Sequence, residues 1–174
     1  MIRIFRILIL FLGAAVMSAA SSGAFAQAGP FGTSVEMHQH SSGNVYVTGY
    51  FNGDIATEFL VDTGSGYVTI STSTYRKISK KVDTQYLRTI RGALANDKVI
   101  KLAIYRVAHL SIGSQCDLFD VEVAVMPGES VNILGINALQ QKQPFALQFD
   151  PPQLLLSNCG SLSPPQATAA LSAR

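Results

Sequence analysis

The sequence has few charged residues, few histidines and few cysteines for its 174 residues. Lys, Arg, Asp and Glu make up 14% of the chain, and the formal net charge is +2. Soluble domains carry roughly 25% charged residues, whereas nucleic-acid-binding domains concentrate positive charge on one face. No basic cluster is combined with an aromatic platform. The composition therefore gives no support to nucleic acid or an anionic surface as a partner.

The shortage of histidine argues against a metal site. His38 and His40 form an H-x-H pair on a segment with strand character, so both side chains can face the same way. Zinc takes three or four protein ligands, and no further His or Cys cluster accompanies this pair. We expect a solvated strand face here, and we expect neither a metal nor a cofactor. The cluster formed by Lys77, Lys80 and Lys81 is interpreted as a solvated helix face.

Long apolar runs are also missing. The run from Ile7 to about Met17 is shorter than the roughly 20 residues that span a bilayer. Arg3 and Arg6 lie before it, and Ala24-Phe25-Ala26 follows. This layout is typical of a secretory signal peptide over residues 1–26, with an uncleaved anchor as the alternative. We expect an exported protein, in a bacterial periplasm or secreted, with no membrane span after cleavage.

Export sets the expectation for the two cysteines, Cys116 and Cys159. An oxidising compartment lets a disulfide form and persist, and a single pair leaves only one connectivity. Neither cysteine lies in a C-x-x-C motif or near a histidine. A structural disulfide is therefore the expected role, provided that the two Cα atoms come close enough.

The composition along the chain predicts one folded domain over residues 35–158. Residues 27–34 are small and contain Gly and Pro, so we expect a loose segment there. Residues 159–174 have little to bury, and we expect a disordered C-terminal tail.

Strands dominate the predicted domain, and the expected fold class is all-β with one or two short helices. Asn52-Gly53 lies between two runs rich in β-formers, which is a strong hairpin signal. The short helices are predicted over 74–81 and 137–142. The predicted strands cover 45–50, 56–61, 68–71, 99–112, 121–126 and 153–157.

The polar step Asp62-Thr63-Gly64-Ser65 is the first candidate functional element. It follows the apolar residues 59–61 and precedes β-branched residues, so the carboxylate lies on a tight turn at the edge of a core. The tripeptide alone could be an ordinary turn, because all its residues favour turns. A phosphate loop and a serine nucleophile elbow both require a following helix, and a strand is predicted there instead.

The second element is the apolar segment Ile133-Leu134-Gly135, which runs into the predicted helix over 137–142. Alone it could be an ordinary strand-to-helix junction with a permissive glycine. The combination of both elements is more specific than either one. Residues 59–65 resemble the active-site strand and loop of aspartic proteases, and residues 133–139 resemble the hydrophobic-hydrophobic-Gly segment and helix of retropepsins.

The resemblance to single-domain retropepsins extends from about residue 45 to 157. It implies a closed β-barrel or sandwich with a flap hairpin, whose tip would be Ala95, Asn96 and Asp97. The family often has Ala-Asn-Gly at the tip, so Asp97 departs from its pattern. It also implies that Asp62 is the catalytic carboxylate and that Ile133, Leu134 and Gly135 form the adjacent strand.

The resemblance assigns supporting roles to the rest of the motif. Thr63 would reach the partner's main chain, and Gly64 would let its backbone amide approach the carboxylates. Ser65 is positioned to donate a hydrogen bond to Asp62 and hold its charged form.

One acid per chain is too few for this chemistry. Hydrolysis requires both an activated water and a protonated leaving amine, and two carboxylates that share a proton supply both. The sequence contains one Asp-Thr-Gly and no internal duplication. The expected enzyme is therefore a homodimer in which two copies of Asp62 hydrolyse an extended peptide.

Two other functions are consistent with the same residues. A retropepsin-fold module could bind peptides or dimerise in the periplasm without turnover. A small disulfide-linked structural protein could use the Asp-Thr-Gly only as a turn. Loss of cleavage on changing Asp62 to Asn would separate the enzyme from both.

Overall fold

The computed structural model describes residues 31–94 and 97–160. The predictions for residues 1–26 and for most of the C-terminal tail lie outside this range. The described residues form β1 (Thr33–Glu36), β2 (His38–Gln39), β3 (Val45–Phe51), β4 (Ile55–Val61), β5 (Val68–Ser71), α1 (Thr72–Ile78), β6 (Thr84–Ala93), β7 (Val99–Ile112), β8 (Cys116–Met126), β9 (Ile133–Leu134), α2 (Ile136–Gln141), β10 (Phe145–Phe149) and β11 (Pro152–Leu156). The predicted all-β fold class with short helices is confirmed.

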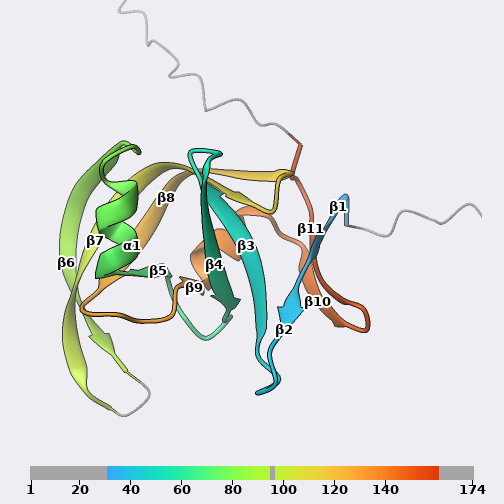
Figure 1. Cartoon of the computed structure of the whole chain (residues 1–174), viewed down its shortest axis with the longest axis horizontal. Helices are drawn as coiled ribbons and strands as arrows, with labels where there is room; N and C mark the ends of the chain where they lie inside the picture. Colours follow the sequence, from blue (N-terminus) through green and yellow to red (C-terminus); the bar gives the residue numbers. More distant parts are fainter. Residues whose placement is uncertain (1–30, 95–96, 161–174) are drawn as a thin grey trace, which may run out of the picture.

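Six strands close into a barrel. The larger sheet has the order β2-β3-β4-β9-β5-β8-β7-β6, and β3 also pairs with β7, so the strands from β3 to β7 form a closed circuit. β6 lies outside this circuit and pairs with β7 as a long hairpin (Figure 1). We call the β6–β7 hairpin the flap hairpin. Its outer edge, on β6, pairs with no other described strand.

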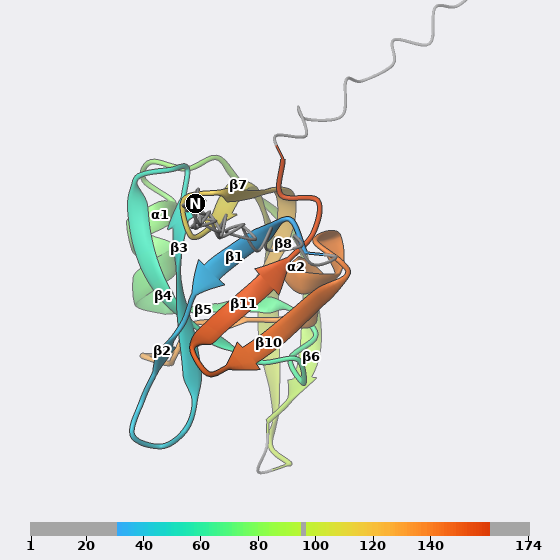
Figure 2. The ribbon, with the colours of Figure 1, turned by 90° about the vertical axis from the view of Figure 1, so that its right-hand side faces the viewer.

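A second, three-stranded sheet has the order β1-β11-β10 (Figure 2). Thr33 and Ser34 belong to β1 and pair with Leu156 and Leu155 of β11. The prediction that residues 27–34 are loose is therefore wrong for the last two of them. Two residues after a stretch with Gly and Pro are too few to give a strand signal, but β11 supplies a backbone to which they hydrogen-bond.

The folded region also extends past the predicted boundary at residue 158. Cys159, which was expected in the disordered tail, is 6% exposed and forms a disulfide with the fully buried Cys116. The bridge ties the chain after β11 to the beginning of β8. The buried Lys142 donates a hydrogen bond to the carbonyl oxygen of Asn158 (3.0 Å), and burial lowers the pKa of this lysine.

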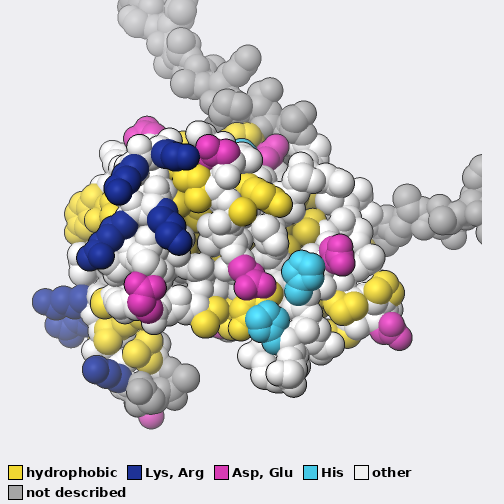
Figure 3. All heavy atoms as spheres, viewed as in Figure 1, with side chains coloured by type: hydrophobic (Ala, Val, Ile, Leu, Met, Phe, Trp, Pro, Cys, Tyr) yellow, Lys and Arg dark blue, Asp and Glu magenta, His cyan; other side chains and the backbone are white. Residues whose placement is uncertain are grey.

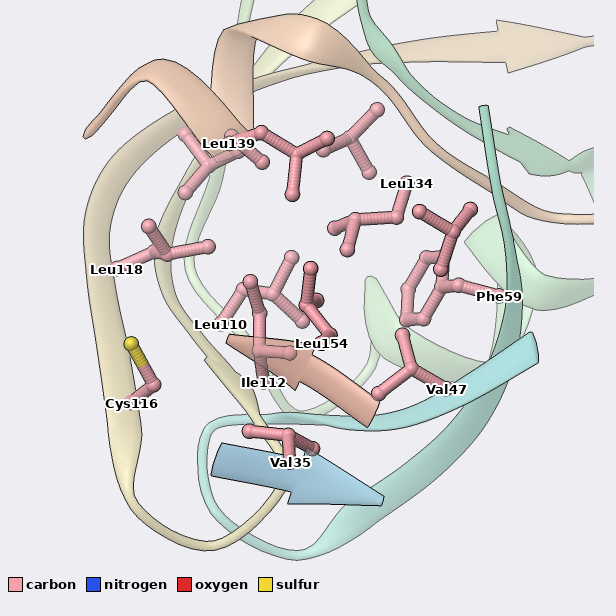
Figure 4. Close-up of a cluster of buried hydrophobic side chains, with 14 of the residues drawn as sticks. Val35, Val47, Phe59, Leu110, Ile112, Cys116, Leu118, Leu134, Leu139 and Leu154 are labelled. Atoms are coloured by element: carbon pink, nitrogen blue, oxygen red, sulfur yellow. The ribbon is translucent and has the colours of Figure 1, made fainter. Parts of the chain in front are cut away.

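The core lies inside the barrel and under the smaller sheet. β3 alternates buried and half-buried residues along its length, as expected for a strand with one face on a core. Side chains from both sheets and from α2 meet there, and they include Val47, Phe59, Leu110, Ile112, Leu118, Leu134, Leu139 and Leu154 (Figure 4).

Turns and caps follow local sequence rules. Asn52 and Gly53 have φ values of 51° and 79°, left-handed conformations at the centre of a turn that the Asp54 amide closes on the Phe51 carbonyl oxygen. Ser71 caps α1 by accepting a hydrogen bond from the amide of Thr74. The helix consequently begins at Thr72, two residues before its predicted start. No helix among the described residues is long and apolar enough to cross a membrane.

Candidate active site

Asp62 is the first residue after β4. Leu60 and Val61 pair in parallel with Ile133 and Leu134 of β9, and the amide of Asp62 donates to the carbonyl oxygen of Leu134 at 3.2 Å. The structure thus brings together the two elements that the sequence analysis singled out. The backbone of Asp62 is therefore fixed to the barrel by the pairing of β4 with β9.

The loop after Asp62 folds back onto its side chain. The amide of Gly64 donates to Oδ1 of Asp62 at 2.8 Å, and the amide of Ser65 donates to the Asp62 carbonyl oxygen at 3.3 Å. These contacts orient the carboxylate without another side chain. Asp62 is half-buried, while Thr63 and Gly64 are exposed. An exposed loop that presents a half-buried acid leaves room for another molecule to approach it.

The expected hydrogen bond from Ser65 to Asp62 is not formed. The Ser65 hydroxyl instead donates to the carbonyl oxygen of Tyr67 at 3.0 Å. This local contact, between a serine and the backbone two residues later, is one that Ser side chains commonly make in turns. Ser65 therefore stabilises the loop and not the charge of Asp62.

Gly135 lets two backbone segments approach closely. A Cβ atom at this position would collide with the carbonyl group of Tyr67 and lie 2.9 Å from the Ser65 oxygen. The next amide, that of Ile136, donates to the Ser65 oxygen at 2.8 Å. Because only glycine fits here, residue 135 locks the Asp62 loop against the β9–α2 junction.

Two asparagines that received no role from the sequence hold the same junction. Asn137 accepts from the amide of Val68 at 2.7 Å and donates to the carbonyl oxygen of Glu122 at 2.8 Å. Asn132 accepts from the amide of Ser71 at 3.1 Å. Each amide side chain bridges backbone groups of neighbouring strands. The sequence signal that could have identified them is their position, since Asn132 and Asn137 lie on either side of the apolar segment 133–136.

Asp62 lies in a cleft of about 660 Å³ between the barrel and the flap hairpin. The barrel side contributes Asp62, Gly64, Ser65 and Tyr67, with Met126 and Ile133 beside them. The flap hairpin contributes Ile90, Arg91, Gly92, Ala93, Leu94 and Leu102. The lining is mostly apolar, and its charged residues are Asp62 and Arg91, as in sites that bind a ligand's apolar groups and place a few polar ones.

Tyr67 connects the Asp62 loop to the flap hairpin. Arg88 of β6 donates two hydrogen bonds to the Glu122 carboxylate, at 2.9 and 2.6 Å, and one to the Tyr67 hydroxyl at 3.3 Å. The register of β6 shifts between Tyr86 and Arg88 and is regular from Arg88 onward, so Arg88 lies on the same face as the cleft-lining Ile90, two residues later. Hydrogen bonds from Arg88 hold the pKa of Glu122 below its usual range.

The flap tip is described only in part. Ala95 and Asn96 lie outside the described residues. Asp97 is exposed with φ 61°, and its amide donates to the carbonyl oxygen of Leu94 at 2.9 Å. Asp tolerates this left-handed conformation better than most residues. The departure from glycine at this position is therefore compatible with a tight turn.

The histidines do not gather at a metal site. Within the described parts of the chain, no group of three or more His, Cys, Asp or Glu residues is placed to hold a metal ion. His40 stacks on Tyr46, with ring centroids 4.1 Å apart, and its Nε2 lies 3.7 Å from a Glu58 oxygen.

The family model described as Aspartyl protease matches residues 47–138, which is more than half of the chain. The chain belongs to the aspartyl protease family. A retropepsin-like aspartic protease from Rickettsia conorii has a similar structure, with a TM-score of 0.53 and 19% sequence identity, over 72% of this chain and 90% of that chain. At that identity the likeness shows the fold, which is retropepsin-like. No curated protein matches the chain.

Proposed function

We propose that this aspartyl protease family member is an endopeptidase that works as a homodimer. The observation that carries the proposal is the half-buried Asp62, the single acid that lines the described part of the cleft. One carboxylate cannot be both base and acid in the same step, whereas two that share a proton can. Retropepsin-like proteins are typically dimers, which supports a second copy of the chain as the source of the second Asp62.

In the proposed reaction, one carboxylate removes a proton from water as the water oxygen attacks the carbonyl carbon of the peptide. The protonated carboxyl of the partner gives its proton to the carbonyl oxygen. The C–N bond then breaks as the amine takes up the proton that the first carboxylate removed, and one hydroxyl of the tetrahedral intermediate returns a proton to the partner carboxylate. The pair is thereby left with one shared proton, as before the reaction, and the barrel backbone holds each carboxylate in place.

An extended peptide is the substrate that fits the cleft. The outer edge of β6 pairs with no other described strand, and β6 contributes the apolar Ile90 and the cation Arg91 to the cleft. An extended peptide can pair with such an edge while its side chains enter the cleft. Localisation outside the cytoplasm belongs to the same proposal, and the Cys116–Cys159 disulfide supports it, because such bridges persist in oxidising compartments.

The test compares the mature wild-type chain with Asp62→Asn on a mixed peptide library, from acid to neutral pH. We expect the variant to lose cleavage by at least about 10³-fold, because the remaining amide neither removes nor supplies the required proton. Equal melting temperatures would show that folding is unchanged. Binding of peptides without cleavage by the wild-type chain would favour the non-catalytic module. Cleavage that survives in the variant would contradict the proposal.

A further inference from the structure

Charge is distributed very unevenly over the described residues, although the whole chain is nearly neutral. Residues 72–112, which form α1 and the flap hairpin with their connections, contain nine Lys and Arg against two Asp, a formal charge of +7. The other described residues contain nine Asp and Glu against one Lys, a formal charge of −8. We call residues 72–112 the basic half. The net charge of +2 conceals this separation.

The cations of the basic half are all exposed. Figure 3 shows Lys and Arg side chains gathered over α1 and along the flap hairpin, and none over β2, β3 and β4 on the same face. Arg88 is paired with Glu122, and Lys81 lies 4.0 Å from an Asp54 oxygen. Five others form no ion pair with a described residue: Arg76, Lys77, Lys80, Arg91 and Lys101. Most of this charge is therefore available to attract an external anion.

The flap hairpin places part of this charge beside the cleft. Ile90 and Leu102 are opposite each other and line the cleft. Arg91, the next residue of β6, also lines the cleft, and it pairs across the hairpin with Lys101. Arg91 therefore lies at the cleft itself, and Lys101 lies opposite it on the neighbouring strand. The attraction between these exposed cations and an anionic peptide extends over about one Debye length, which is about 8 Å at physiological ionic strength.

We propose that the basic half selects anionic polypeptides as substrates, by drawing acidic segments that flank the cleaved bond toward the flap hairpin. This inference rests on the proposed peptidase activity and adds the class of its substrate. A polypeptide is favoured over a lipid surface because the charge extends along the hairpin that walls the cleft. Electrostatic attraction of this kind raises association rates by roughly 10- to 10³-fold and weakens steeply with salt.

The test uses three peptides with one shared apolar core and with acidic, neutral or basic flanks. At about 0.01 M salt, we expect kcat/KM for the acidic peptide to exceed that for the basic peptide by about tenfold or more. At about 1 M salt, where the Debye length falls to about 3 Å, the difference should largely disappear. Equal kcat/KM values for the three peptides at low salt would overturn the inference and leave the peptidase proposal intact.

Two double variants separate the position of charge from its amount. Arg91→Gln with Lys101→Gln lowers the net charge by two on the flap hairpin. Ser114→Glu with Gln115→Glu lowers it by two on an exposed turn outside the basic half. We expect the first pair to lose most of the preference for the acidic peptide and the second pair to keep it. The same loss in both variants would contradict the proposed role of the basic half.

A binding measurement keeps the inference testable if no peptide is cleaved. The same three peptides, carrying a fluorophore, are titrated with Asp62→Asn and followed by anisotropy, with anionic phospholipid vesicles as a competitor. Tighter binding of the acidic peptide at low salt supports the inference even without turnover. No difference among the peptides, or binding of the vesicles alone, overturns it.

Discussion

The two walls of the cleft are held in different ways. The Asp62 loop is fixed by backbone hydrogen bonds to Leu134 and Ile136 and by a glycine contact that tolerates no side chain. The flap hairpin joins the barrel through the backbone of β7, whose pairing with β8 begins at Ala103. Its outer strand β6 reaches β8 and the Asp62 loop through side chains, by the contacts of Arg88 with Glu122 and Tyr67. This difference suggests a division of labour. The wall that carries the acid is fixed by backbone contacts, whereas β6 is joined to that wall by side-chain hydrogen bonds that can be exchanged.

The largest effect is expected when the wall that carries the acid is changed at Gly135. A methyl group in Gly135→Ala would overlap the backbone of Tyr67, so we expect a loss of stability on the order of 3 kcal/mol or more together with activity. Gly66→Ala is the matched control, because a Cβ at Gly66 meets nothing within 4 Å. Urea unfolding of both variants measures the effect. Equal stabilities would show that the β9–α2 junction is softer than described.

An intermediate effect is expected at the side-chain tether. Glu122→Gln weakens the paired hydrogen bonds that hold Arg88, so Tyr67 loses a fixed partner. We expect KM for a peptide to rise severalfold while kcat changes little, because the flap side of the cleft is affected more than Asp62. Arg88→Lys keeps the charge but not the paired geometry, and should show a similar change. A fall in kcat with unchanged KM would contradict this assignment.

The same tether predicts a pH dependence. The pKa of Glu122 is lowered in the folded protein, so the tether is complete above the ordinary pKa of a glutamate. It is lost only as the pH falls through the lowered value. KM of the wild-type chain should therefore rise at the acid end of the profile. In Glu122→Gln that rise should be absent, which a pH series of KM values would measure.

The smallest effect is expected at Ser65. Because its hydroxyl donates to Tyr67 and not to Asp62, Ser65→Ala should leave the acid limb of kcat/KM in place. Stability should fall by about 1 kcal/mol, the typical net value of one hydrogen bond. A shift of the acid limb toward higher pH would instead restore the role that the sequence suggested. The pH profile and one unfolding curve are sufficient for this test.

The sequence predicted the parts of the fold that depend on local chemistry. Asn52-Gly53 formed the predicted turn because both residues tolerate positive φ, and the predicted strand over 68–71 coincides with β5. β1 was missed because Thr33 and Ser34 are ordered only by pairing with β11. β6 was recognised only as part of a flap, since the register shift near Arg88 breaks the alternation that identifies a strand.

The candidate site was predictable in its residue types but not in its side-chain directions. Asp62 and Gly135 were assigned to one site from their motifs, and the backbone contacts place them together. The Ser65 hydroxyl could donate to the Asp62 carboxylate or to the Tyr67 carbonyl oxygen. The sequence does not show which of these two acceptors lies nearer. The tether from Arg88 to Glu122 joins residues 34 positions apart and required the folded sheet.

The central claim is that two chains complete one active site, and specific activity as a function of protein concentration tests it most directly. If the dyad forms only in the dimer, specific activity should fall on dilution, in step with the dimer fraction measured by sedimentation. At chain concentrations well below the dimer dissociation constant, the cleavage rate should become proportional to the square of the chain concentration. Specific activity that stays constant while the chain sediments as a monomer would contradict the account.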